Sequence, residues 1–162
     1  AQSRMFLWVK KEIQEMLPEW YLTKDGDQYC LELYERHYSC YNYKDGRKRK
    51  LFVGPGEKVV LRTWEADAMF VWRKFIDDSG QKGVYCSVFR NESNKKSSEL
   101  ILQADAIAFA VWPDKRHYTY VNANKVKSTN PGYCFKRAGW KQCGITKKHK
   151  YIILEKYENE MD

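Results

Sequence analysis

Long apolar runs and clusters of metal-binding side chains are both missing from this sequence of 162 residues. No stretch approaches the roughly 20 consecutive apolar residues that a membrane-spanning helix needs. The three histidines show neither H-x-H nor H-x-x-x-H spacing, and the five cysteines (30, 40, 86, 134 and 143) form no C-x-x-C pair. These absences argue against a membrane protein, a tight metal site and a disulfide-stapled secreted domain. We therefore expect a reduced, intracellular protein.

Positive charge is in excess, because 29 Lys and Arg residues stand against 21 Asp and Glu residues, a formal net charge of +8. Hydrophobic residues make up 43% of the chain and aromatic residues 15%, which is typical of a folded protein. The charge favours a phosphate-rich partner, either a nucleic acid or a nucleotide cofactor. An equally open alternative is a surface charge that only keeps the protein in solution.

Apolar residues three or four positions apart predict an amphipathic helix at Met5–Leu17, which Pro18 ends. A second helix is expected at 97–112, where a serine cap and an acidic first turn precede apolar residues at helical spacing. Residues 66–75 fit a strand or a helix. Alternating apolar residues predict strands at Tyr29–Tyr34, 55–64, 84–91, 117–123 and 150–157.

Strands and helices alternate in the second half of the chain, with no repeat or linker between them. This order predicts an α/β or α+β sheet with helices on its faces. We expect a single domain over residues 1–162. Its parts are an N-terminal helix (1–20), a basic aromatic loop or hairpin (35–52) and a second half (84–157) that would hold a cofactor.

The start of the helix expected at 97–112 is suited to an anion. Its first backbone N–H groups, the positive end of its dipole and the hydroxyls of Ser97 and Ser98 predict a phosphate site, with Lys95 and Lys96 beside it. The alternative is an ordinary capped helix that binds nothing.

A second short helix is expected within KSTNPGYCFKRAGW (127–140), between the Asn-Pro-Gly turn and Gly139. The second half of the chain thus has the order strand, helix with a phosphate-competent start, strand, short helix and final strand. This order resembles that of the GCN5-related N-acetyltransferase superfamily. That resemblance implies an α+β, three-layer fold: a central mixed, mostly antiparallel twisted sheet with helices on both faces. It also implies that two strands splay apart to admit the pantetheine of acetyl-CoA.

The resemblance assigns cofactor-binding roles to residues around the two helix starts. These are Phe89, Arg90, Asn91, Ser97, Ser98, Asn130 and Tyr133. Two features depart from the family pattern. The segment FRNESNKKSS lacks the glycines of the family's phosphate loop, and Phe135 stands where the family has its general-acid tyrosine, with Tyr133 two residues earlier.

A narrower resemblance rests on RHYSC (36–40), GPGEKVVL (54–61), SVFRNES with SSELI, and YTYVN (118–122). These segments are similar to the Mom branch of the same fold, bacteriophage enzymes that modify the exocyclic amine of adenine in DNA and so protect it from restriction. The resemblance implies double-stranded DNA as substrate, an acetyl-CoA or other acyl or aminoacyl donor, and iron, in the cytoplasm of a bacterial host. It implies His37 and Tyr38 as metal ligands. The catalytic residues it implies are His37, Tyr38, Ser39, Ser98, Tyr120 and Asn122.

The segment KDGRKRK (44–50) carries five positive charges around an Asp-Gly turn, and tyrosines precede it. We expect Arg36, Arg47, Lys48, Arg49 and Lys50 to contact DNA, because charge and aromatic residues coincide there. A solvated loop with structural tyrosines is the alternative. A homodimer would suit a duplex target. Two other functions stay open: an ordinary N-acetyltransferase, and a DNA-binding module without catalysis.

Overall fold

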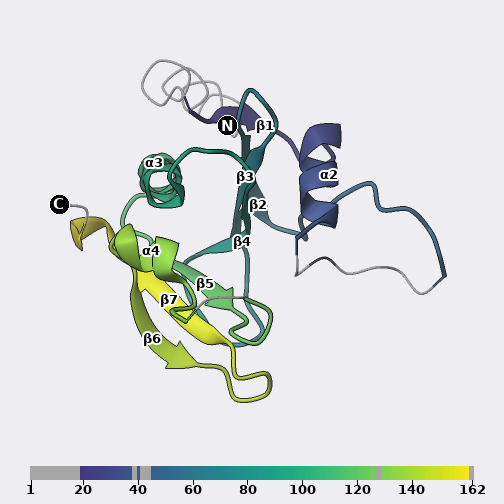
Figure 1. The fold of residues 1–162 in the computed structure, drawn as a ribbon. Helices are drawn as coiled ribbons and strands as arrows, with labels where there is room; N and C mark the ends of the chain where they lie inside the picture. Colours follow the sequence, from purple (N-terminus) through teal and green to yellow (C-terminus); the bar gives the residue numbers. More distant parts are fainter. Residues whose placement is uncertain (1–18, 38–39, 41–44, 127–128, 161–162) are drawn as a thin grey trace.

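The computed structural model describes residues 19–37, 40, 45–126 and 129–160 (Figure 1). The helix predicted at Met5–Leu17, the residues Tyr38 and Ser39, and much of the aromatic stretch before Asp45 lie outside the described residues. The elements follow in the order β1 (Tyr21–Thr23), α2 (Gln28–Glu35), β2 (Glu57–Arg62), β3 (Ala68–Lys74), β4 (Val84–Asn91), α3 (Ser97–Val111), β5 (His117–Val121), α4 (Tyr133–Arg137), β6 (Lys141–Ile145), β7 (Ile152–Lys156) and a 3-10 turn (Glu158–Glu160).

Seven strands form one mixed sheet in the order β1-β2-β3-β4-β5-β7-β6. Every neighbouring pair is antiparallel except β4 and β5, which run parallel because α3 carries the chain back between them. The fold is therefore α+β with a mixed, mostly antiparallel sheet, which confirms the coarse fold prediction. None of the described helices is long and apolar enough to cross a membrane.

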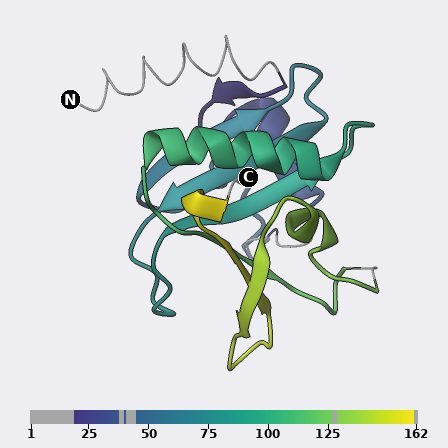
Figure 2. The ribbon, with the colours of Figure 1, turned by 90° about the vertical axis from the view of Figure 1, so that its left-hand side faces the viewer.

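Helices cover both faces of the sheet, as predicted (Figures 1 and 2). On one face, α2 packs Cys30, Leu31, Leu33 and Tyr34 against side chains of β2, β3 and β4. On the other face, α3 buries an almost continuous apolar surface, and Figure 2 shows it lying across the strands. The strand predicted at 84–91 and the helix predicted at 97–112 are confirmed, and residues 68–74 of the ambiguous segment form a strand.

The strand predicted at Tyr29–Tyr34 is wrong, because this segment is helix α2. The Asp27 carboxylate caps the helix by accepting hydrogen bonds from the Tyr29 and Cys30 backbone N–H groups at 2.9 and 3.0 Å. Thr23 holds the same carboxylate through its hydroxyl at 2.6 Å. The cap fixes a helical first turn, so that buried residues at 30, 31, 33 and 34 share one face despite their strand-like composition.

Candidate functional site

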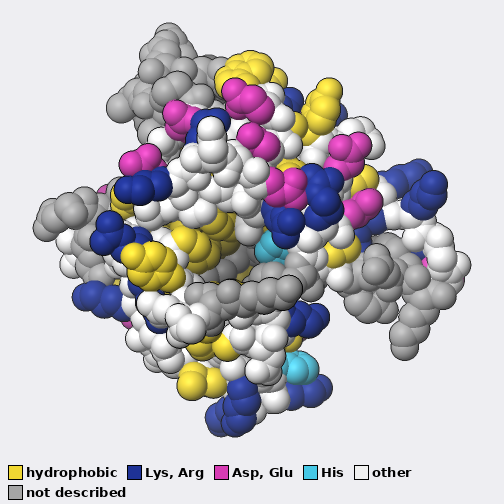
Figure 3. Space-filling model, viewed as in Figure 1, with side chains coloured by type: hydrophobic (Ala, Val, Ile, Leu, Met, Phe, Trp, Pro, Cys, Tyr) yellow, Lys and Arg dark blue, Asp and Glu magenta, His cyan; other side chains and the backbone are white. Residues whose placement is uncertain are grey.

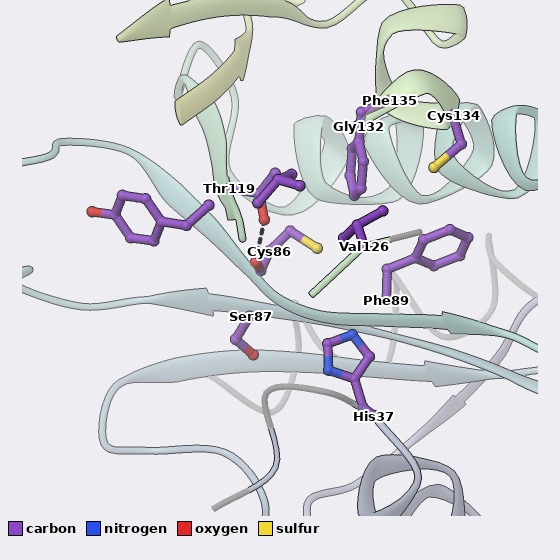
Figure 4. Close-up of a pocket in the computed structure, with 11 residues that line it drawn as sticks. His37, Cys86, Ser87, Phe89, Thr119, Val126, Gly132, Cys134 and Phe135 are labelled. Atoms are coloured by element: carbon purple, nitrogen blue, oxygen red, sulfur yellow. Dashed lines mark hydrogen bonds between the residues drawn. The ribbon is translucent and has the colours of Figure 1, made fainter. Parts of the chain in front are cut away.

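The central feature is the point at which β4 and β5 part. The two parallel strands pair only at Val84 with His117 and at Tyr85 with Tyr118, although β4 continues to residue 91 and β5 to residue 121. A cavity of about 160 Å³ lies at this parting (Figure 4). The side chains that line it come from β4, β5, α4 and neighbouring segments: His37, Cys86, Ser87, Phe89, Thr119, Tyr120, Val121, Val126, Gly132, Cys134 and Phe135.

A β-bulge bends β4 at the cavity. Cys86 stands opposite Trp72 on β3, whereas Val88 stands opposite Val71, so Ser87 is an extra residue in the ladder. A bulge increases the local twist and leaves the extra residue outside the regular pairing. The Ser87 hydroxyl oxygen is buried and has no hydrogen-bond partner in the part of the chain that the structure describes. Ser87 is also one of the residues that line the cavity.

His37 reaches the cavity from the turn that follows α2. Its backbone N–H donates to the Tyr34 carbonyl at 2.8 Å, and Figure 4 shows its ring turned toward β4 on the same side as Ser87. Burial, together with the Arg90 charge, lowers the pKa of His37 to about 4, although a hydrogen bond to the Phe89 backbone raises it in part. The imidazole is therefore neutral at pH 7. Because one ring N–H donates to the Phe89 backbone carbonyl, the other ring nitrogen is an acceptor.

Helix α4 closes the cavity from the opposite side of β4 (Figure 4). It confirms the short helix predicted within 127–140. Gly132 precedes it with a φ of 78°, and a Cβ atom there would lie 2.6 Å from Cδ1 of Leu154, so a side chain at this position would strain the backbone and displace Leu154. This close approach brings the Phe135 ring onto the cavity.

Two cysteines line the same apolar part of the cavity. Burial raises the pKa of both the Cys86 and the Cys134 thiols, so neither is a thiolate at pH 7. The Thr119 hydroxyl donates to the Cys86 backbone carbonyl at 2.8 Å and links the two strands where they stop pairing. These cysteines therefore act as small apolar side chains rather than nucleophiles.

The loop between β4 and α3 is tied together by its own polar groups. The Asn91 amide oxygen accepts the Ser93 backbone N–H at 2.9 Å, and the Ser93 hydroxyl accepts the Lys95 backbone N–H at 3.1 Å. The Lys95 ammonium lies 3.8 Å from Glu19 and 3.5 Å from Glu65. The Ser93 and Lys95 amides and the Lys95 charge therefore have partners within the protein.

Tyr120 is a fixed wall of the cavity. Its hydroxyl lies 2.6 Å from the Ser79 hydroxyl and donates to the Asp77 carboxylate at 3.0 Å. Tyr118 donates to the same carboxylate oxygen at 2.8 Å. Burial raises the pKa of Tyr120. The predicted catalytic residue therefore presents a neutral ring held in one place by the loop after β3.

His37, Phe89 and Tyr120 are the predicted site residues that the structure brings together at the cavity. Ser98 lies in the first turn of α3, and Asn122 lies just after β5. Asn130 accepts a hydrogen bond from Lys136, and Tyr133 is 54% exposed. None of these four side chains lines the cavity. Sequence analysis missed Ser87, Cys86 and Thr119, whose place depends on the bulge and the parting of the strands.

Positive charge lies near the cavity on the α2 side. Arg36 and Arg90 both donate to the Glu92 carboxylate, at 2.8 and 2.9 Å, and these bonds lower the pKa of Glu92. Arg90 is the charge that acts on the His37 ring. In the space-filling view a hollow with hydrophobic side chains inside it opens in this face, and Lys and Arg side chains lie on several sides of it (Figure 3).

The predicted DNA-binding segment Arg47–Lys50 lies along α2. It shares a groove with the acidic side chains Glu32 and Glu35. Arg47 pairs with Asp45 at 3.4 Å, and the Arg49 guanidinium lies 5.0 Å from the centre of the Tyr34 ring. Acidic neighbours therefore offset part of this segment's charge.

A buried ionic network supports α4 from behind. The Asp105 carboxylate on α3 accepts hydrogen bonds from His117 at 2.8 Å, Trp140 at 3.0 Å and Lys156 at 3.2 Å. Lys156 also donates to the Ala138 carbonyl, just after α4, at 2.6 Å. Asp105 and His117 are fully buried, and Lys156 is 1% exposed. The network fixes α4, and with it one wall of the cavity, against α3 and β7.

Of the two predicted iron ligands, His37 lies at the cavity and Tyr38 lies outside the described residues. Within them, no three His, Cys, Asp or Glu side chains gather in a way that could hold a metal ion. His37 is the one histidine at the cavity, and the thiols beside it are protonated. We therefore assign no chemical step to iron.

Comparison with protein-family models finds no family that matches this chain, and comparison with curated proteins finds no similar protein. The function is therefore argued from the site itself.

Proposed function

We propose that this protein is an acyltransferase-like enzyme that modifies the exocyclic N6 amine of adenine in DNA. The observation that carries the proposal is the cavity at the parting of β4 and β5, with a neutral imidazole at its wall. Strands that splay around a cofactor site are what the resemblance to GCN5-related N-acetyltransferases implies. The element order from β4 to β7 supports that resemblance.

The donor has a slender, apolar reacting end. Phe89, Val126 and Phe135 give the α4 side of the cavity an apolar lining. This lining suits the reacting end of acetyl-CoA or of another acyl or aminoacyl donor.

The reaction joins adenine N6 to the acyl carbon of the donor. N6 is a weak nucleophile because its lone pair is conjugated with the ring, so the enzyme must orient it and accept its proton. The acceptor nitrogen of the neutral His37 ring takes that proton as the bond between N6 and the acyl carbon forms. The Ser87 hydroxyl donates to the oxygen on which negative charge develops. The bond to the leaving group then breaks, and the proton passes from His37 to that group.

DNA as the acceptor is supported by the charge of the chain and of the cavity surroundings. The net charge is +8, and the Arg90 charge acts on the His37 ring, although Arg90 also pairs with Glu92. An N6 amine inside a duplex is out of reach, so the adenine must leave the stack to enter a site of this size.

The test is mass spectrometry of nucleosides from plasmid DNA of cells that express the protein. We expect a heavier deoxyadenosine whose mass identifies the transferred group. His37→Asn and Ser87→Ala should each reduce it at least tenfold, whereas Leu102→Ala, on the exposed side of α3, should leave it unchanged. Unmodified DNA from cells holding folded wild-type protein would overturn the proposal, and a titration with acetyl-CoA would then test for an ordinary acetyltransferase.

A further inference from the structure

The turn between β6 and β7 carries three lysines that we call the lysine tip: Lys147, Lys148 and Lys150. All three are exposed. Across the described part of the chain, no side chain forms an ion pair or hydrogen bond with any of their ammonium groups. Three unpaired like charges on one turn repel each other, so an anionic partner would stabilise this arrangement.

The lysine tip is held in a defined shape. The Thr146 backbone N–H donates to the Tyr151 carbonyl at 2.9 Å, and the Tyr151 backbone N–H donates to the Thr146 hydroxyl at 2.8 Å. The His149 ring stacks on the Tyr151 ring at 5.2 Å. A turn closed in this way presents its charges with little further loss of entropy on binding.

The lysine tip precedes the end of β7 that pairs with the cavity-lining end of β5. Ile152, two residues after Lys150, pairs with Val121 on β5, and Val121 lines the cavity. Arg90 lies near the end of β4, on the other side of the parting. Figure 1 shows the β6–β7 hairpin projecting away from α2 and the basic segment that follows it. The lysine tip is therefore connected, through the first residues of β7, to the end of β5 that lines the cavity.

We propose that the lysine tip binds the phosphate backbone of the duplex DNA whose adenine enters the cavity. This inference rests on the proposed function, and it assigns the electrostatic contact to residues 147–150 in addition to the segment Arg47–Lys50. Acidic side chains lie in the groove beside Arg47–Lys50, whereas the lysine tip has no charged partner among the residues that the structure describes. The unpaired charges are the ones that gain most from phosphate.

The expected effect follows from counterion release. Each phosphate contact contributes about 0.9 to the slope of log K against log salt concentration. Loss of three contacts should lower that slope by about 2.7, which corresponds to roughly 100-fold weaker binding at about 0.15 M salt. The loss should be similar for any duplex sequence, because phosphate carries no sequence information.

The experiment measures binding of a fluorescent duplex between about 50 and 200 mM salt, the range in which such contacts dominate. The test variant is Lys147→Gln, Lys148→Gln and Lys150→Gln together. The control removes the same charge through Lys24→Gln, Lys82→Gln and Lys115→Gln, three exposed lysines elsewhere. We expect the lower slope and weaker binding in the test variant alone, with equal urea midpoints for all three proteins.

Equal binding by the test variant and the wild type, or equal losses in both variants, would overturn the inference. A tip-dependent affinity for vesicles containing phosphatidylserine, with DNA binding unaffected, would assign the tip to a membrane instead. Wild-type protein that binds duplex through the tip but leaves adenine unmodified would keep this inference and overturn the proposed function.

Discussion

Replacement of Asp105 by asparagine tests the buried network behind α4. The carboxylate accepts three hydrogen bonds from side chains at 2.8 to 3.2 Å, and it is the only negative charge among the groups bonded to Lys156 in the described structure. Removal of one partner from a buried ion pair leaves an uncompensated charge and costs about 3–5 kcal/mol. Asp105→Asn should therefore lower the free energy of unfolding by that amount. For a chain of this length, each kcal/mol shifts the melting temperature by about 2–4 °C.

The assay is urea unfolding followed by tryptophan fluorescence, because Trp72 and Trp140 both lie next to His117 in this core. Lys156→Met should cost about as much as Asp105→Asn. The double variant removes both charges, so its loss should be smaller than the sum of the single losses by about 0.5–3 kcal/mol. Asp45→Asn, which breaks a surface pair with Arg47, should change stability by less than about 0.5 kcal/mol.

Two results would refute this reasoning. A loss below about 1 kcal/mol for Asp105→Asn would mean that the carboxylate is not the counter-charge that Lys156 requires. Strict additivity in the double variant would mean that the two groups do not interact.

Three further predictions concern pH, backbone geometry and thiol reactivity. Burial lowers the pKa of His117, so this residue gains a proton below about pH 6.5 in the unfolded chain but not in the folded chain. The urea midpoint should therefore fall as the pH is lowered from 7 to 5. His117→Asn should weaken that pH dependence. Gly132→Ala places a Cβ atom 2.6 Å from Leu154 at a φ of 78° and should lower the free energy of unfolding by about 1–3 kcal/mol. An unchanged urea midpoint would contradict this close approach. Cys86 is buried, and burial raises the pKa of its thiol. A thiol reagent should therefore label the exposed Cys143 first and reach Cys86 only on unfolding. Early labelling of Cys86, measured by mass spectrometry, would be inconsistent with this burial.

Elements with strong local patterns could be predicted from the sequence. The strand at 84–91 has a regular alternation, and the helix at 97–112 has helical spacing along its whole length, so both were predicted within a residue. Helix α2 was mistaken for a strand, because Tyr, Cys and Leu suit both structures and the cap at Asp27 decides between them. Strand β6 was not predicted, since it is an edge strand whose side chains are mostly exposed and show no alternation.

The site could be predicted only in part. His37 and Tyr120 were proposed from resemblance to a family, and the structure places both at the cavity. Ser87 lies there because β4 carries an extra residue, a property of the pairing with β3 rather than of the local sequence. Asp105 is one of the few polar residues of α3, and the sequence alone does not show that three donors from distant parts of the chain converge on it.

The parting of β4 and β5 also divides the sheet into two ribbons, β1–β4 and β5–β7–β6, each of which can unfold locally without the other. Two residue pairs, the hydroxyl of Thr119 and the hydrogen bonds of Tyr118 and Tyr120 to Asp77 join the β1–β4 ribbon to the β5–β7–β6 ribbon. Cohesion between the ribbons therefore depends on side chains, on α3 and on the Asp105 network more than on strand pairing. Amide hydrogens in the β5–β7–β6 ribbon should exchange through openings that leave β2, β3 and β4 protected. Because β4 and β5 pair at only two positions, the gap between them can widen while the pairing within each ribbon is kept. A donor can then enter between the two strands while both ribbons stay folded.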